Sequence, residues 1–124
     1  MKRCLIVDDS SVIRKVARHI LESMQYEVVE AENGQEALDR CRTAPAPDLI
    51  LLDWHLPVMG AMEFLAALRL TVAGRRPYIL YCTTENDPAD IARAFASGAD
   101  DYFIKPFDRA SLVNKVADLN AAAA

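Results

Sequence analysis

The amino-acid sequence predicts an α/β fold, a doubly wound parallel sheet of five strands with five helices on its two faces. The first observation is an alternation between short apolar runs and longer segments whose apolar residues recur at helical spacing. The second is the run Leu-Ile-Leu-Leu at residues 49–52, which is typical of a central strand buried on both faces. Right-handed crossovers between parallel strands then place helices on both sides of the sheet.

The composition suits one domain with a sizeable core. The 124 residues are 52% hydrophobic, and a fold of this size buries roughly two thirds of the surface that its unfolded chain exposes. The net charge of −4 gives no indication of a nucleic-acid or membrane-surface partner. No apolar stretch approaches the ~20 residues of a membrane span, and the apolar start meets Asp8 too early for a signal peptide. A cytoplasmic location is therefore expected.

The three cysteines, Cys4, Cys41 and Cys82, show no CxxC spacing and are odd in number. Cys4 and Cys82 lie in apolar, strand-like runs. We expect buried free thiols, the usual state in a reducing compartment.

The first strand is expected at residues 4–7 and ends at the pair Asp8-Asp9. Ser10 or Ser11 can cap the following helix, because a hydroxyl accepts a hydrogen bond from the free amides of the first turn. The apolar residues at helical spacing, which we expect to face inward, are Val12, Ile13, Val16, Ala17, Ile20, Leu21 and Met24. The residues expected on the solvated side are Arg14, Lys15 and Arg18.

The second strand, residues 26–31, carries two glutamates that favour an edge position. Asn33-Gly34 begins the second helix, and two prolines end it before the third strand. That third strand, residues 49–53, contains the apolar run and ends on Asp53. Its carboxyl end is where open α/β sheets bind ligands.

A third helix is expected at residues 62–70 and a fourth strand at residues 78–82. Pro88 suits the first turn of the fourth helix, and Gly98 ends that helix. A short fifth strand follows at residues 102–104.

Asp108 can cap the last helix. We expect one complete domain over residues 1–120, without a linker or second domain, and a frayed alanine tail over residues 121–124. Five such units fit the flavodoxin-like strand order 2-1-3-4-5, which we adopt as the known order of that fold.

Polar residues follow four of the five expected strands. In a parallel sheet all carboxyl ends lie at one edge, so these residues meet there; they are Asp8, Asp9, Asp53, Thr83 and Lys105. Two carboxylates 4 Å apart repel each other by about 4 kcal/mol near a protein surface, and a cation relieves that repulsion. An oxygen-only cluster favours Mg²⁺, which keeps some of its waters and shares its shell with phosphate.

Each residue also has a simpler explanation. Asp8 and Asp9 can serve only as a turn and helix cap, and Thr83 can be an ordinary hydroxyl at a strand end. Tyr102 fits a half-buried strand position, since strands favour tyrosine. The occurrence of the acids, the threonine and the lysine at one edge favours a functional site, whereas Tyr102 gains less support from it.

These residues together resemble a known family. Asp8-Asp9, the strand ending at Asp53 with Pro57 after it, Thr83, and Lys105-Pro106 are similar to the receiver domain of two-component response regulators. The resemblance extends over essentially the whole chain. It implies a CheY-like single-domain response regulator without an attached output domain.

The resemblance implies roles for matching residues. Asp53 would accept a phosphoryl group from the phosphohistidine of a sensor histidine kinase or a histidine phosphotransfer protein. Asp8, Asp9, Asp53 and the backbone carbonyl of His55 would hold Mg²⁺, with Asp8 acting largely through water. Lys105 would offset phosphoryl charge, and the Thr83 hydroxyl would donate to a phosphoryl oxygen.

The same resemblance implies a switch. Thr83 would move toward the phosphoryl group, Tyr102 would turn into the space it leaves, and the surface of the fourth helix, fifth strand and fifth helix would change. Around the mouth of the site, His55, Thr84 and Glu85 are expected to modulate the lifetime of the phosphoryl group. The sequence departs from the family at Met59-Gly60-Ala61, where the family usually has Met-Asp-Gly, so a cap of the third helix is lost.

The leading interpretation is a phosphorylation-controlled switch that catalyses its own phosphorylation and dephosphorylation and is not otherwise an enzyme. It would act on an unidentified protein partner as a monomer or as a weak, phosphorylation-dependent dimer. A phosphorelay intermediate and a phosphate sink are alternatives. An aspartate-nucleophile phosphatase is weaker, because His55 stands where such enzymes have a second Asp. A docking module without phosphorylation is also weaker, because Asp53 and Lys105 are both present.

Overall fold

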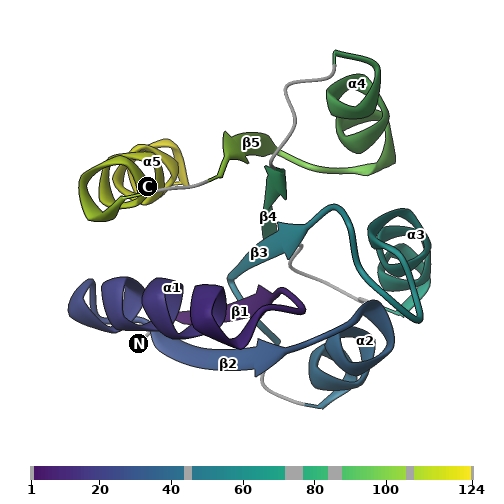
Figure 1. The fold of residues 1–124 in the computed structure, drawn as a ribbon, viewed down its shortest axis with the longest axis horizontal. Coiled ribbons are helices and arrows are strands. Elements are labelled where there is room, and N and C mark those ends of the chain that lie inside the picture. Colours follow the sequence, from purple (N-terminus) through teal and green to yellow (C-terminus); the bar gives the residue numbers. More distant parts are fainter. Residues whose placement is uncertain (1, 44–45, 72–76, 84–87, 106–107, 124) are drawn as a thin grey trace.

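The computed structural model describes residues 2–43, 46–71, 77–83, 88–105 and 108–123 of the chain (Figure 1). Strands and helices alternate throughout, as the sequence predicts. In chain order they are β1 (Arg3–Val7), α1 (Ser11–Ser23), β2 (Glu27–Ala31), α2 (Gly34–Arg42), β3 (Leu49–Asp53), α3 (Ala61–Thr71), β4 (Tyr78–Thr83), α4 (Pro88–Ser97), β5 (Asp101–Ile104) and α5 (Arg109–Ala123).

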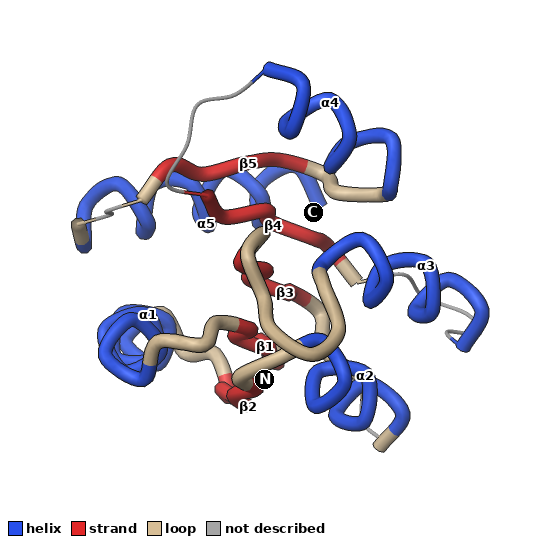
Figure 2. Tube along the Cα trace, turned by 45° about the vertical axis from the view of Figure 1, so that its right-hand side comes forward, coloured by secondary structure: helices blue, strands red, loops and turns tan. Residues whose placement is uncertain are grey.

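All neighbouring strands are parallel and the sheet order is β2-β1-β3-β4-β5, which confirms the predicted flavodoxin-like arrangement. Helices α1 and α5 cover one face of the sheet, and α2, α3 and α4 cover the other (Figure 1). The second view shows β3 and β4 lying between these two helical layers (Figure 2). The glutamate-bearing strand β2 lies at the edge, as predicted.

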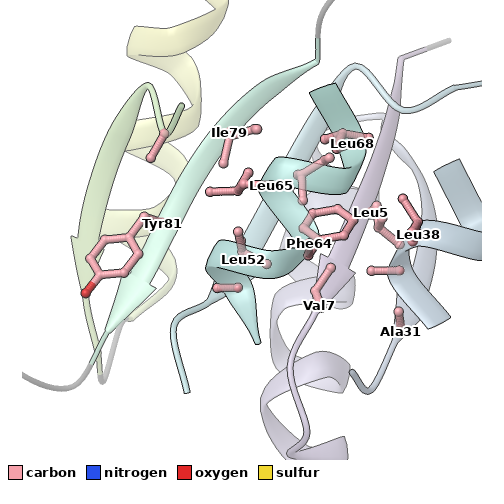
Figure 3. Close-up of a cluster of buried hydrophobic side chains, with 14 of the residues drawn as sticks. Leu5, Val7, Ala31, Leu38, Leu52, Phe64, Leu65, Leu68, Ile79 and Tyr81 are labelled. Carbon is pink, nitrogen blue, oxygen red and sulfur yellow. The ribbon is translucent and has the colours of Figure 1, made fainter. Parts of the chain in front are cut away.

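Alternate residues of each strand enter two separate cores, because successive side chains of a strand point to opposite faces. In β1, Ile6 packs under α1 and α5, whereas Leu5 and Val7 belong to the core under α2, α3 and α4. Figure 3 shows this second core, with the fully buried Phe64 of α3 over the sheet. All five residues of β3 are buried, as expected of a central strand.

The cysteines are free, and Cys4 and Cys82 are buried, as predicted, while Cys41 is half-buried. Burial raises the pKa of Cys82 to about 12, because the surrounding apolar side chains disfavour the thiolate. The buried thiols therefore act as small apolar side chains.

Four helices begin at the residues that the sequence predicts, and α4 does so with Pro88. Ser10 caps α1 by accepting a hydrogen bond from the Ile13 amide at 3.3 Å. Asn33 caps α2 through the Glu36 amide at 2.8 Å. Asp108 caps α5 through the Ser111 amide at 2.8 Å.

The predicted faces of α1 are partly wrong. Val12 and Val16, expected to face inward, are 68% and 46% exposed. Arg14 and Arg18, expected on a solvated side, both bind the carboxylate of Glu30 in β2. The apolar positions of α1 form one continuous arc of about 180° around the helix, with Val12 and Val16 at one edge, so spacing alone did not show which part of the arc the sheet would bury. The sheet buries the other part of this arc, which contains Ala17, Ile20 and Leu21.

The longest described helix is α5, with 15 residues. It continues to Ala123, so residues 121–123, expected to form a frayed tail, are helical in the structure. Among the residues that the structure describes, no helix combines the length and the apolar character needed to cross a bilayer.

Candidate functional site

The register of the sheet places the predicted site residues. Val7 of β1 pairs with Leu52 of β3, so Asp8 and Asp53 are the next residues on two adjacent parallel strands. Asp53 in turn pairs with Cys82 of β4, one residue before Thr83.

On the far side of β4, Thr83 pairs with Ile104, the residue before Lys105. Four elements therefore deliver their polar ends to the same edge of the sheet. The site lies beside the point where the chain order reverses between β1 and β3.

The ammonium group of Lys105 lies between two carboxylates. Its Nζ is 2.6 Å from Oδ2 of Asp8 and 3.2 Å from Oδ1 of Asp53. All three side chains are buried. Buried charges are tolerated when they are paired and hydrogen-bonded, and Lys105 provides that pairing for both acids.

Asp8 is also fixed by backbone contacts. Its Oδ1 accepts a hydrogen bond from the Ser10 amide at 2.9 Å, and its own amide donates to the carbonyl of Ala31 at 3.1 Å. Arg14 donates to the Asp8 carbonyl at 2.6 Å. The sequence did not predict this role for Arg14. The only signal was a basic residue in the first turn after the acidic pair, and helical spacing does not reveal which way such a side chain turns.

Three carboxylates gather at this edge. One oxygen each from Asp8, Asp9 and Asp53 lies within 4.8 Å of the other two. Asp8 and Asp53 are buried, whereas Asp9 is exposed and keeps the cluster open to solvent. Three carboxylates and one ammonium leave two negative charges when all four groups are ionised. An open, oxygen-only donor set with residual negative charge fits a hard divalent cation such as Mg²⁺.

The environment shifts the pKa of Asp53 and of Lys105. Burial raises the pKa of Asp53 above its usual 3.8, and the charge of Asp8 adds to this; Lys105 and the backbone amide of His55 oppose the shift. For Lys105, burial acts to lower the pKa, but Asp8 and Asp53 outweigh it and the pKa lies above its usual 10.5. Lys105 is therefore charged at neutral pH. Ionisation of the buried Asp53 costs free energy, and a bound cation would reduce that cost.

The remaining predicted residues lie around this cluster. Thr83 is buried, and its carbonyl accepts a hydrogen bond from the Lys105 amide at 2.7 Å. His55 is exposed in the segment after β3. Thr84 and Glu85 lie outside the described residues.

Tyr102 lies away from the acidic cluster, because it pairs with Tyr81, two positions before the carboxyl end of β4. Its ring is 36% exposed and makes an edge-on contact with Phe95 of α4, with 6.3 Å between the ring centres. The structure thus brings together the acids and the lysine and places the tyrosine on the α4 side of β5.

Comparison with known proteins agrees with the fold. The sequence model of the response regulator receiver domain matches residues 4–117, and the chain belongs to this family. It is a CheY-like receiver domain, the signalling module of response regulators in two-component systems.

Two curated relatives illustrate the similarity. The chain is 34% identical over 119 residues to the chemotaxis protein CheY of Halobacterium salinarum, covering 95% of this chain and 96% of that protein. It is 35% identical over 115 residues to the phosphate regulon transcriptional regulatory protein PhoB of Klebsiella pneumoniae, covering 93% of this chain. The chain spans 50% of the length of that relative.

Solved structures of receiver domains are also similar to this chain. The chemotaxis protein CheY4 of Vibrio cholerae superposes with a TM-score of 0.87 at 36% identity, covering 95% of this chain and 98% of that one. The receiver domain of the sensor histidine kinase PA1611 of Pseudomonas aeruginosa, which has magnesium coordinated in its active-site cleft, gives a TM-score of 0.80 at 30% identity. That match covers 91% of this chain and 92% of the other.

Proposed function

We propose that this receiver domain is a phosphorylation-controlled switch that accepts a phosphoryl group on Asp53 from a sensor histidine kinase or a histidine phosphotransfer protein. The observation that carries the proposal is the arrangement of Asp53, which is buried, 3.2 Å from the ammonium of Lys105, and clustered with Asp8 and Asp9. Attack by a carboxylate oxygen forms a P–O bond as the P–N bond of phosphohistidine breaks. The imidazole nitrogen leaves with the electron pair and takes up a proton.

The acidic cluster would hold the metal that this reaction requires. The carboxylates of Asp8, Asp9 and Asp53 and the backbone carbonyl of His55 are the proposed ligands of Mg²⁺. When bound, Mg²⁺ supplies positive charge that stabilises the developing charge on the phosphoryl oxygens. The all-oxygen donor set and the magnesium in the cleft of the related PA1611 receiver support this assignment.

Lys105 and Thr83 are proposed to bind the phosphoryl oxygens. Lys105 already faces Asp53, so its ammonium needs only a short movement to reach an oxygen on the modified side chain. The hydroxyl of the buried Thr83 would donate a second hydrogen bond. We propose that His55, together with Thr84 and Glu85, tunes the access of water and hence the lifetime of the aspartyl phosphate.

The output is proposed to pass through Tyr102. Its ring now lies partly exposed against Phe95 of α4. A phosphoryl group that draws Thr83 inward would favour a buried position of the ring and a changed surface of α4, β5 and α5. A downstream protein that distinguishes the two surfaces would then read the phosphorylation state.

We propose a cytoplasmic location and a monomer, or a weak dimer that forms on phosphorylation. A diffusible effector, a phosphorelay intermediate and a phosphate sink all use the same chemistry and differ only in the protein that meets the phosphorylated form. A phosphatase-like enzyme is disfavoured because the position two residues after Asp53 carries His55 in place of an acid.

Trp54 offers the experiment, because it is next to Asp53 and is the only tryptophan of the chain. Its ring contacts Tyr81 edge-on, with 4.7 Å between the ring centres. We expect Mg²⁺ to change its fluorescence, and acetyl phosphate to cause a further change that depends on Mg²⁺. The measurement is a titration of Mg²⁺ followed by addition of the phosphodonor.

The matched control is Asp53→Asn, which keeps the shape of the side chain and removes the nucleophile. It should abolish the acetyl phosphate response without unfolding the domain. A stable phosphoryl adduct on this variant, detected by mass spectrometry, would show that the phosphoacceptor is a different residue.

A further inference from the structure

The segment between β3 and α3, residues 54–60, carries the carbonyl group of His55. Two backbone hydrogen bonds hold this segment near its ends. The Trp54 amide donates to the carbonyl of Cys82 in β4 at 3.0 Å, and the carbonyl of Met59 accepts from the Gly34 amide at 3.1 Å. The position of the His55 carbonyl therefore depends on where α2 holds the end of the segment.

Gly34 is the first residue of α2 and is buried. A Cβ atom at this position would lie 2.3 Å from the carbonyl oxygen of Met59 and 3.0 Å from its carbonyl carbon. Non-bonded carbon atoms pack best at about 3.5–4.0 Å. The obstacle is backbone, so a change of rotamer cannot remove it. Only glycine allows α2 and the segment to approach this closely.

The residue next to this contact is held in an unfavourable conformation. Val58 has a φ of 66°, in the left-handed region that β-branched residues rarely adopt. Its side chain is 83% exposed, so no packing of that side chain compensates for the strain. The surrounding backbone must impose this conformation. Met59 follows Val58, and its carbonyl accepts the hydrogen bond from the Gly34 amide, which can impose this conformation on Val58.

We propose that Gly34 is a positioning residue for the metal site, because its lack of a side chain lets α2 fix the segment that presents the His55 carbonyl to Asp8, Asp9 and Asp53. The inference rests on the proposed function. It adds that the affinity for Mg²⁺ depends on a residue of a different helix that contributes no ligand.

Gly34→Ala tests the inference through the dissociation constant for Mg²⁺, measured by isothermal titration calorimetry together with urea unfolding. We expect the folded variant to bind Mg²⁺ about tenfold more weakly. This is the low end of the loss in metal affinity that follows when a group that orients a metal ligand is substituted. The control is Gly60→Ser, in the same segment, where a Cβ would meet only Oε1 of Glu63, at 4.0 Å. This variant should bind Mg²⁺ as the wild type does.

The outcomes separate the two proposals. A folded Gly34→Ala protein with the affinity of the wild type overturns the role of Gly34 and leaves the proposed function intact. A wild-type protein that does not bind Mg²⁺ overturns both. Equal weakening by Gly34→Ala and Gly60→Ser overturns the role of Gly34, because the effect would then not come from the backbone contact.

Hydrogen exchange of the wild-type protein tests the same inference without a substitution. If Gly34 and the metal are coupled through the segment, Mg²⁺ must slow exchange of the Gly34 amide, since coupling between two sites is reciprocal. The control is the amide of Ala37, which donates to the carbonyl of Asn33, the N-cap of the same helix, at 3.0 Å. Mg²⁺ should slow its exchange only as far as the whole fold is stabilised, and should slow the Gly34 amide by more. A Gly34 amide whose exchange is independent of Mg²⁺ overturns the proposal, even if Gly34→Ala does not fold.

Discussion

At the scale of single residues, the electrostatics of the site depend on Lys105. Its ammonium is within 3.2 Å of Asp53 and 2.6 Å of Asp8, and both carboxylates are buried. Removing one partner of a buried ion pair leaves an uncompensated charge, which is far more costly than losing a surface pair. Lys105 thus stabilises the metal-free fold in addition to its proposed role toward a phosphoryl group.

Lys105→Met should therefore lower the free energy of unfolding in EDTA by roughly 3 kcal/mol at neutral pH, the low end for a broken buried pair. The low end is expected because Asp53, whose pKa is already raised, can take up a proton. Urea unfolding with and without Mg²⁺ measures the effect, and Mg²⁺ should restore more stability to the variant than it adds to the wild type.

The double variant Lys105→Met/Asp8→Asn provides the control. It also removes one of the two carboxylate charges that lose their ion pair with Lys105 in the single variant. It should recover part of the lost stability in EDTA. A Lys105→Met protein as stable as the wild type would show that the carboxylates do not need the ammonium.

At the scale of elements, the departure of the sequence from its family at Met59-Gly60-Ala61 has a structural consequence. Helix α3 begins at Ala61, and the Phe64 amide donates to the carbonyl of Gly60 at 2.9 Å, so Gly60 occupies the N-cap position. A glycine cannot accept a hydrogen bond from the first turn with a side chain. Glu63 stands three residues later, where the partner of a capping box is found.

Gly60→Ser should complete this capping box and raise the free energy of unfolding by about 0.3 kcal/mol. A Cβ at residue 60 would meet only Oε1 of Glu63, at 4.0 Å, an ordinary van der Waals distance, so no steric cost offsets the gain. Urea unfolding of Gly60→Ser, wild type and Gly60→Ala should rank them in that order of stability. Equal stability of the serine and alanine variants would show that the hydroxyl does not cap α3.

At the scale of the whole molecule, the proposed metal ligands come from segments far apart in the chain. Asp8 and Asp9 follow β1, whereas Asp53 and His55 lie at and after the end of β3. Only the folded sheet brings them within reach of one cation, so an unfolded chain has little affinity for it. Metal binding is therefore linked to global unfolding.

Mg²⁺ should raise the free energy of unfolding by about 1.4 kcal/mol for each tenfold increase in concentration above its dissociation constant. Thermal unfolding across a range of Mg²⁺ concentrations measures this slope. Asp9→Asn removes an exposed ligand and leaves the buried ion pairs of Lys105 with Asp8 and Asp53 in place. It should shift the rise of the melting temperature to higher Mg²⁺ concentrations. A melting temperature of the wild type that does not respond to Mg²⁺ would contradict the linkage.

The sequence by itself determined the type and order of the elements and the composition of the acidic cluster. Strand and helix signals are local, so the buried run at residues 49–52, the start of the second helix at Asn33-Gly34 and the cap Asp108 could be predicted without any tertiary contact. In a parallel sheet all carboxyl ends share one edge, so the element order predicted that Asp8, Asp9 and Asp53 lie at that edge. Their placement on neighbouring strands followed from the strand order adopted for this fold.

Tertiary structure decided what depends on distances through space. It selected which part of the apolar arc of α1 is buried, exposing Val12 and Val16, and it turned Arg14 toward Glu30 and the carbonyl of Asp8. It also set the backbone of Gly34 against Met59. Most of these partners belong to different elements, and packing between elements, which no local periodicity encodes, determines whether their atoms meet.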